Sequence, residues 1–214
     1  PKAAMFVVTS AYMAVSAVVL ALYVAANPIR HMSVIGAAWS VGAVMAAIWG
    51  LIDYFHLPSP FPLQVLPGRA SGLFKDPNVY STYIIFPMIL MIHKMIQGET
   101  KRPILLSLSL AITSIGLFLS FSRGAWANFV MAAMMLFALT FILYDSPKLR
   151  LRLAIYVVGA LLFATVAFII LMSIPTIQKM FVERFALVQS YDGGETGRFG
   201  NQLRSIPELL RRPF

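Results

Sequence analysis

The sequence predicts an all-α membrane protein, a polytopic bundle of transmembrane helices followed by an extramembrane helical tail. Two observations carry this prediction. Of the 214 residues, 59% are hydrophobic and only 12% are charged, which is about half the charged fraction of a soluble domain. The apolar residues also gather in long runs that match a hydrocarbon core of about 30 Å at about 1.5 Å per helical residue. We therefore expect about six spans in this chain.

The expected spans are residues 3–26, 33–52, 80–96, 104–121, 124–144 and 153–174. Short basic loops follow the first, third and fifth spans. A proline-rich loop at 53–78, a tight hairpin around Arg123 and a polar tail follow the second, fourth and sixth. Because consecutive spans alternate in direction, these last three segments share one membrane face. The predicted domains are thus a helix bundle over 1–174 and a loop and helix segment over 175–214, which we expect to be truncated at Phe214.

The charges of the loops indicate the orientation only in part. Cations near the membrane are almost equally numerous on the two faces, so the positive-inside rule comes close to a tie. The cations of the short loops stand in tight hairpins with no other evident use. This favours placing the short loops in the cytoplasm and the longer segments outside it.

Cations from three separate segments meet on the face of the longer loops. They are Arg69, Lys75, Arg123 and Arg198. Arg123, within FLSFSRGAW, separates two uncharged runs and therefore lies at a membrane surface, where an unpaired charge is costly. It could act there simply as an interfacial anchor. Converging cations in a medium of low dielectric instead suit a diphosphate, whose oxygens match guanidinium groups, and we expect a lipid diphosphate as the ligand.

Other kinds of site find little support in the sequence. The chain has no cysteine, its acidic residues form no close pair, and His31, His56 and His93 are not spaced as metal ligands. We therefore expect neither a metal site nor a cofactor. The net charge of +9 lies in loops between spans, so it points to anionic membrane lipids and not to nucleic acid. The centres of the spans carry no charged residue, which argues against a proton-coupled carrier.

Three blocks resemble a known family. They are GRASGLFKDPNVYSTYI at 68–84, LSFSRGAW at 119–126 and TGRFGNQLRSIPELLRRPF at 196–214. In order and spacing they resemble the O-antigen ligase and O-antigen polymerase family of bacterial polytopic envelope glycosyltransferases, over most of the chain from about residue 30 onward.

The resemblance implies a reaction and a location. A glycan would pass from undecaprenyl diphosphate to a lipid A core or a growing polysaccharide acceptor, by inversion and without metal, on the periplasmic face of the bacterial inner membrane. Arg123 matches the arginine of the family's Ser-Arg-Gly block and Arg198 the arginine that opens its periplasmic helix, so both would hold the diphosphate. Arg69 matches an arginine in the loop before the Pro-Asn pair. The family's proposed catalytic histidine belongs to a His-Asn pair that we expect beyond Phe214.

Two other functions are compatible with the sequence. One is a small-anion transporter, or an accessory membrane protein of the same superfamily, which would move a labelled solute without any lipid-linked sugar. The other is a structural subunit of an envelope complex, in which the arginines would tolerate lysine or glutamine. Within the transferase reading, ligase and polymerase differ in their acceptor, and no motif in the chain identifies the acceptor.

Overall fold

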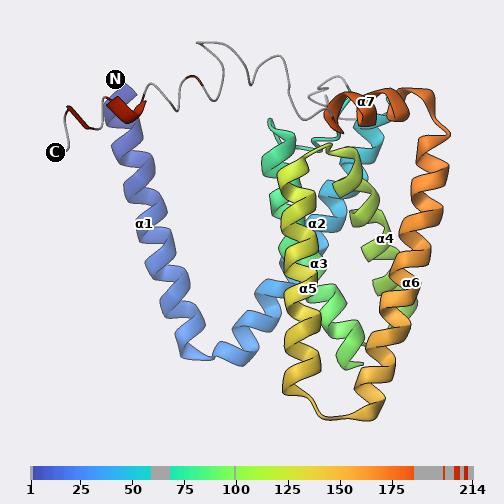
Figure 1. The fold of residues 1–214 in the computed structure, drawn as a ribbon. Coiled ribbons are helices and arrows are strands. Elements are labelled where there is room, and N and C mark those ends of the chain that lie inside the picture. The colour runs from blue at the N-terminus through green and yellow to red at the C-terminus, as the bar shows by residue number, and fades with distance from the viewer. Residues whose placement is uncertain are drawn as a thin grey trace.

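The structure is a computed structural model that describes residues 2–58, 68–98 and 100–185, with the short stretches 200, 205–207 and 210–211. The described residues form helices and turns and contain no strand. Figure 1 shows the helices as a bundle of antiparallel rods, with the first helix standing apart from the others. The predicted all-α class is confirmed.

The described helices alternate in direction along the bundle. They are α1 (Lys2–Ala26), α2 (Pro28–Tyr54), α3 (Pro77–Gln97), α4 (Pro103–Leu119), α5 (Arg123–Leu143), α6 (Pro147–Met172) and α7 (Pro175–Phe185). Among them, α1, α2, α3, α5 and α6 are long and apolar enough to cross a membrane, and α4 is apolar but shorter. At about 1.5 Å per residue α4 covers about 25 Å, a little less than a hydrocarbon core. The chain is a multi-pass membrane protein.

Prolines set where most of the described helices begin. Pro28, Pro77, Pro103, Pro147 and Pro175 are the first residues of α2, α3, α4, α6 and α7. A proline suits this position because its φ is already helical and its missing N–H would have no helical partner. The expected loop at Arg30 and His31 is therefore wrong: both lie in the first turn of α2, where the Asn27 side chain accepts a hydrogen bond from the Arg30 N–H at 3.2 Å. The expected loop at 145–152 likewise ends at Ser146, and its basic residues lie in α6.

The core lies where α2, α3 and α4 pack against one another. Small residues on α2 allow this close contact. Ala43 and Ala47 are completely buried, and Tyr80 from α3 enters the space left by Gly50 and Gly116. A Cβ at either glycine would collide with the Tyr80 hydroxyl oxygen. Small residues thus let α2 lie close to α3 and α4.

The remaining helices surround this core unevenly. α5 and α6 pack on α3, and α7 packs on α6, whereas α5 and α6 make little contact with each other. α1 contacts α2 and presents its side chains outward along its length. The gap between α6 and its neighbours is the origin of a cavity described below.

Three segments far apart in the chain meet at one end of the bundle. They are residues 68–76 before α3, residues 120–122 between α4 and α5 together with Arg123 at the start of α5, and helix α7, all at the top of Figure 1. We call this the hairpin end. The expectation that the proline-rich loop, the Arg123 hairpin and the beginning of the tail share one face is confirmed for the residues that the structure describes.

Two cations at the opposite end, Arg150 and Arg152, have structural partners. Arg152 on α6 donates from Nη1 to the carbonyl oxygen of Ile96 at 3.1 Å, near the end of α3. Arg150 forms an ion pair with Asp145 at 2.9 Å and lies over the Phe141 ring, 4.7 Å from its centroid. The expectation that the basic residues of the short loops have no other use is therefore wrong for these two. Arg152 joins two helices, because a guanidinium can bind carbonyl oxygens that a helix end leaves without donors.

Candidate functional site at the hairpin end

The loop before α3 is held tightly against the bundle. The Ala70 N–H donates to the Leu119 carbonyl oxygen at 2.8 Å, which joins the loop to the last residue of α4. Gly72 has φ +56, a left-handed conformation that glycine adopts without strain. A Cβ on Gly72 would also lie 2.8 Å from the Ala46 carbonyl oxygen of α2. The backbone of this loop is therefore fixed at two points, on α4 and on α2.

Arg69 links this loop to the hairpin. Its Nε donates to the Ser120 carbonyl oxygen at 2.8 Å, and its Nη2 donates to the Asn78 side-chain oxygen at 3.1 Å. The side chain is half-buried. A guanidinium with several donors in one plane can bind acceptors on separate segments, and hydrogen bonds to a charged donor are stronger than neutral ones. Arg69 thus joins the loop, the hairpin and the first turn of α3.

The hairpin itself turns through residues 120–122. Ser120 is completely buried, and its hydroxyl donates to the Leu117 carbonyl oxygen at 2.7 Å. Phe121 follows with φ +48, an uncommon conformation for a residue with a side chain. Ser122 is extended, and its side chain makes no capping hydrogen bond to α5. The sharp turn ends α4 at Leu119 and starts α5 at Arg123.

Arg123 is the first residue of α5 and is exposed. The first backbone N–H groups of a helix have no helical acceptor, and the helix dipole adds a positive potential there. The guanidinium therefore adds its charge to a helix end that already favours anions. Arg123 and Arg69 lie close in the fold, because Arg69 binds the residue three positions before Arg123.

The remaining predicted site residues are Lys75 and Arg198. Lys75 is exposed on the same loop as Arg69, next to Asp76. The Asp76 side chain caps α3 by accepting a hydrogen bond from the Asn78 N–H at 2.7 Å. Arg198 lies outside the described residues, as does most of the expected helix at 198–212. Arg69, Lys75 and Arg123 are thus brought to one end of the bundle.

Aromatic rings lie directly under the hairpin. Phe118 stacks on Trp126 with ring centroids 5.5 Å apart, and both rings also stack on Phe181 of α7. The indole nitrogen of Trp126 donates to the Leu117 carbonyl oxygen at 3.0 Å. α7 therefore lies over the hairpin end, held by ring contacts from α4 and α5.

A buried acid near the loop was missed from the sequence. Asp53 is 2% exposed on the last turn of α2, although the sequence suggested a loop residue. Its carboxylate binds the Ser71 side chain, and its Oδ1 has no hydrogen-bond partner among the described residues. Burying a polar atom without a partner costs about 1–3 kcal/mol. The available signal was a carboxylate placed directly after the uncharged run that ends at residue 52.

Two of the three histidines lie at the opposite end of the bundle, whereas His56 lies near Asp53, whose carboxylate binds the Ser71 side chain of the loop. His31 lies at the opposite end, where its ring stacks on Tyr23 with centroids 4.0 Å apart and its Nδ1 contacts the Tyr23 carbonyl oxygen at 2.5 Å. His56 is exposed after α2 with φ +52, and His93 lies near the end of α3. Within the described ranges, no three His, Cys, Asp or Glu residues are grouped so that they could hold a metal ion.

Comparison of the chain with protein-family models, with curated proteins and with solved structures finds no match in any of the three. The interpretation of the site therefore depends on its own geometry and chemistry.

Proposed function

We propose that this protein transfers a glycan from undecaprenyl diphosphate to a lipid A core or a growing polysaccharide, as an O-antigen ligase or polymerase does. The observation that carries the proposal is the docking of the loop at 68–76 onto the α4–α5 hairpin. The hydrogen bonds from Ala70 and Arg69 to Leu119 and Ser120 bring three basic residues from two segments, Arg69 and Lys75 on the loop and Arg123 on the hairpin, to one end of the bundle. The active face would be the periplasmic face of the bacterial inner membrane.

Glycan transfer by this route requires positive charge near the leaving diphosphate. In an inverting transfer, an acceptor hydroxyl oxygen forms a bond to the anomeric carbon while the bond from that carbon to the diphosphate oxygen breaks. The bonding electrons leave with the diphosphate, and the hydroxyl proton passes to a general base. Fixed positive groups that face the developing charge lower the barrier. Arg123 at the first turn of α5 is suited to this role, because the helix end and the guanidinium act together.

Arg69 has a different part in the proposal. Two of its nitrogen atoms bind Ser120 and Asn78, so its main effect is to hold the loop against the hairpin. Lys75 is exposed on that same loop and could approach a phosphate oxygen as a point charge. We therefore assign Arg123 and Lys75 to the diphosphate, with Arg198 as a further candidate, and Arg69 to positioning.

The proposal is tested by replacing Arg123 in the full-length protein in cells. We expect Arg123→Ala to lower glycan transfer by about 30-fold to 1000-fold, because losing a charged contact to the leaving group costs about 2–4 kcal/mol. Arg123→Lys should keep part of the activity, because lysine retains the positive charge. It should not restore all of it, because an ammonium group cannot bind phosphate oxygens bidentately. Transfer is measured as glycan attached to the acceptor, alongside the amount of inserted protein.

Arg102→Ala is the matched control, because Arg102 is an exposed arginine next to the first residue of α4, at the opposite end of the bundle. It should leave glycan transfer unchanged. Normal transfer by Arg123→Ala at normal protein levels would refute the proposal. Uptake of a labelled anion into proteoliposomes without lipid-linked sugar would support the transporter reading in its place.

A further inference from the structure

The last turn of α2 carries an acidic side chain that the bundle buries. Asp53 is 2% exposed, and its Oδ1 has no hydrogen-bond partner among the described residues. Its carboxylate binds the side chain of Ser71, a completely buried residue of the loop at 68–76. A buried carboxylate destabilises a fold unless a positive charge or several donors compensate it. The hydrogen bond to Ser71 therefore joins α2 to the loop but compensates the carboxylate only in part.

A positive charge that acts on this carboxylate comes from the same helix end. A protonated His56 attracts the Asp53 carboxylate, and the His56 N–H donates to the Asp53 carbonyl oxygen at 3.1 Å. The Leu57 N–H donates to the Ile52 carbonyl oxygen at 2.9 Å. These two hydrogen bonds end α2 in a Schellman motif, with His56 in the left-handed conformation at φ +52. Glycine is the usual residue at this position, and here the chain places a titratable side chain there.

The loop and the rest of the hairpin end contribute other charges. On the loop, Arg69 binds the hairpin, Asp76 caps α3 and Lys75 is exposed. Further charged residues at this end are exposed as well: Arg123, Lys179 and Glu183. Because water and salt screen exposed charges, these last residues act weakly on a buried carboxylate. Residues 59–67, which join α2 to the loop, include no charged residue.

The helices that pack on α2 add no charge near its last turn. α4 is uncharged, and the charged residues of α3, His93 and Lys94, lie near its opposite end. α1 has no charged residue after Lys2 and stands apart from the bundle (Figure 1). The hydroxyl of Tyr80, which enters the core beside Gly50, is neutral near neutral pH. Among the described residues, His56 is thus the group that can change the charge beside Asp53 near neutral pH.

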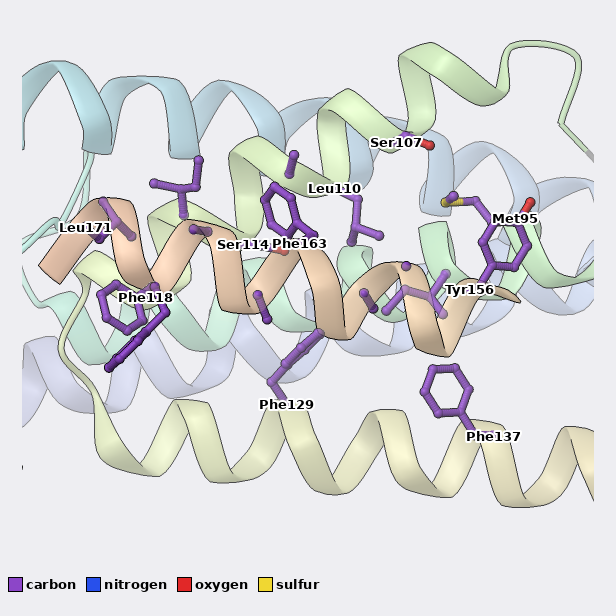
Figure 2. Close-up of a pocket in the computed structure, with 18 residues that line it drawn as sticks. Met95, Ser107, Leu110, Ser114, Phe118, Phe129, Phe137, Tyr156, Phe163 and Leu171 are labelled. Atoms are coloured by element: carbon purple, nitrogen blue, oxygen red, sulfur yellow. The ribbon is translucent and has the colours of Figure 1, made fainter. Parts of the chain in front are cut away.

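An apolar cavity of about 640 Å³ lies between α3, α4, α5 and α6. Figure 2 shows that it runs along the bundle from Phe118 and Leu171, near the hairpin end, to Met95 and Tyr156. Neither α2 nor the loop contributes to its lining, and no charged side chain of the described residues lines it. The cavity therefore adds no charged group to the surroundings of Asp53.

We propose that Asp53 and His56 make the docking of the loop at 68–76 onto α2 sensitive to pH. The inference stands on the contacts of α2 and does not depend on the proposed function. While His56 is protonated, its charge compensates the carboxylate that accepts the hydrogen bond from Ser71. An imidazole loses its charge between about pH 5 and 8. The buried carboxylate then keeps only its bond to Ser71, so the docked loop, which carries Arg69 and Lys75, becomes less stable as the pH rises.

The experiment follows the Ala70 amide, which binds the Leu119 carbonyl oxygen in the docked loop. Hydrogen–deuterium exchange of the full-length protein is measured by mass spectrometry at about pH 6 and about pH 8, on either side of imidazole titration. The result is expressed as protection, the exchange rate of an unfolded amide at the same pH divided by the observed rate. We expect protection to fall about threefold toward the higher pH, the effect of losing a partly exposed ion pair.

Variants of the two residues identify the group that titrates. His56→Asn removes the charge and keeps a residue that tolerates the left-handed conformation, so protection should be low at both pH values. His56→Arg is charged at both, so its protection should be independent of pH and higher than that of His56→Asn. Asp53→Asn keeps an acceptor for Ser71 and should also remove the pH dependence. His93→Asn is the matched control, because His93 lies near the opposite end of α3, and it should behave like the wild type.

Several outcomes would overturn the proposal. Wild-type protection that is equal at the two pH values, or that rises with pH, would do so. So would a pH dependence that survives in His56→Asn or disappears in His93→Asn. If Asp53→Asn does not fold, the two His56 variants still decide the question. Equal protection in His56→Asn and His56→Arg would show that the charge at this position does not hold the loop.

Discussion

Arg69 shows how a residue found as a candidate ligand can act through its neighbours. Its Nε and Nη2 bind Ser120 and Asn78, which belong to two other segments. Hydrogen bonds from a charged donor contribute about 1.5–3 kcal/mol each. A half-buried guanidinium used in this way sets the position of the loop that carries Lys75. In the proposed diphosphate site, Arg69 would therefore act by positioning the loop.

Replacing Arg69 should loosen the loop. Arg69→Met keeps the length of the side chain and removes its donors, so we expect the amide hydrogen of Ala70 to exchange at least tenfold faster with solvent. The reason is that the Ala70 N–H binds the Leu119 carbonyl oxygen and depends on the docked loop. Hydrogen–deuterium exchange with mass spectrometry reports this amide. Lys75→Met, an exposed change on the same loop, should leave its exchange rate unaltered. An unchanged Ala70 rate in Arg69→Met would show that the loop docks without the arginine.

Helix α7 shows at the scale of an element how a short amphipathic helix closes one end of the bundle. Ile177 is completely buried, and Phe181 stacks on Phe118 and Trp126. Met180 contacts the loop: a Cβ on Gly68 would lie 2.8 Å from its sulfur atom. The opposite side of α7, with Lys179 and Val182, is exposed. α7 is thus held to the loop and to the hairpin by one apolar side.

Shortening the buried side chain should release α7. Ile177→Ala is expected to weaken its docking by about 2–4 kcal/mol, the usual cost of a large-to-small change at a buried position. Exchange of the α7 amides should then rise tenfold or more, because opening becomes more frequent. Val182→Ala is the control, since Val182 is 66% exposed on the same helix. Equal exchange in both variants would mean that Ile177 does not hold the helix.

At the scale of the whole molecule, the alternation of helices divides the loops between two faces. The hairpin end carries residues 68–76, residues 120–123 and α7, and the opposite end carries the links after α1, α3 and α5. Hydrogen bonds and ring contacts between distant segments hold the first group together. We therefore expect the two faces to differ in reactivity toward reagents that cannot cross a membrane.

The absence of cysteine makes this division easy to measure. Single cysteines replace exposed residues at the hairpin end, as Lys75→Cys and Gln178→Cys, or at the opposite end, as Lys101→Cys and Lys148→Cys. A membrane-impermeant maleimide added to intact cells should label the first pair and spare the second if the hairpin end is periplasmic. Inverted vesicles should give the reverse pattern. Labelling of one member of each pair from the same side would contradict the arrangement of the helices.

Much of this protein follows from the sequence alone. Low charge and long apolar runs require helices that satisfy their own backbone hydrogen bonds in lipid, so the all-α class and the approximate spans are determined locally. Alternation of the spans also places Arg69, Lys75 and Arg123 on one face. The exact helix starts were missed at Arg30 and Arg150, because the apolar runs begin after the prolines that start the helices.

Only the tertiary structure decided what the individual side chains do. The hydrogen bond from Arg69 to Ser120 joins residues that are far apart in the chain, and the burial of Asp53 also depends on distant segments. The cavity beside Gly159 depends on the space between α6 and its neighbours α4 and α5. Packing between helices in lipid depends on shape and on close contact of small residues, and not on a gain from leaving water. A hydropathy pattern therefore specifies which segments cross the membrane, and contact between them specifies where a ligand can bind.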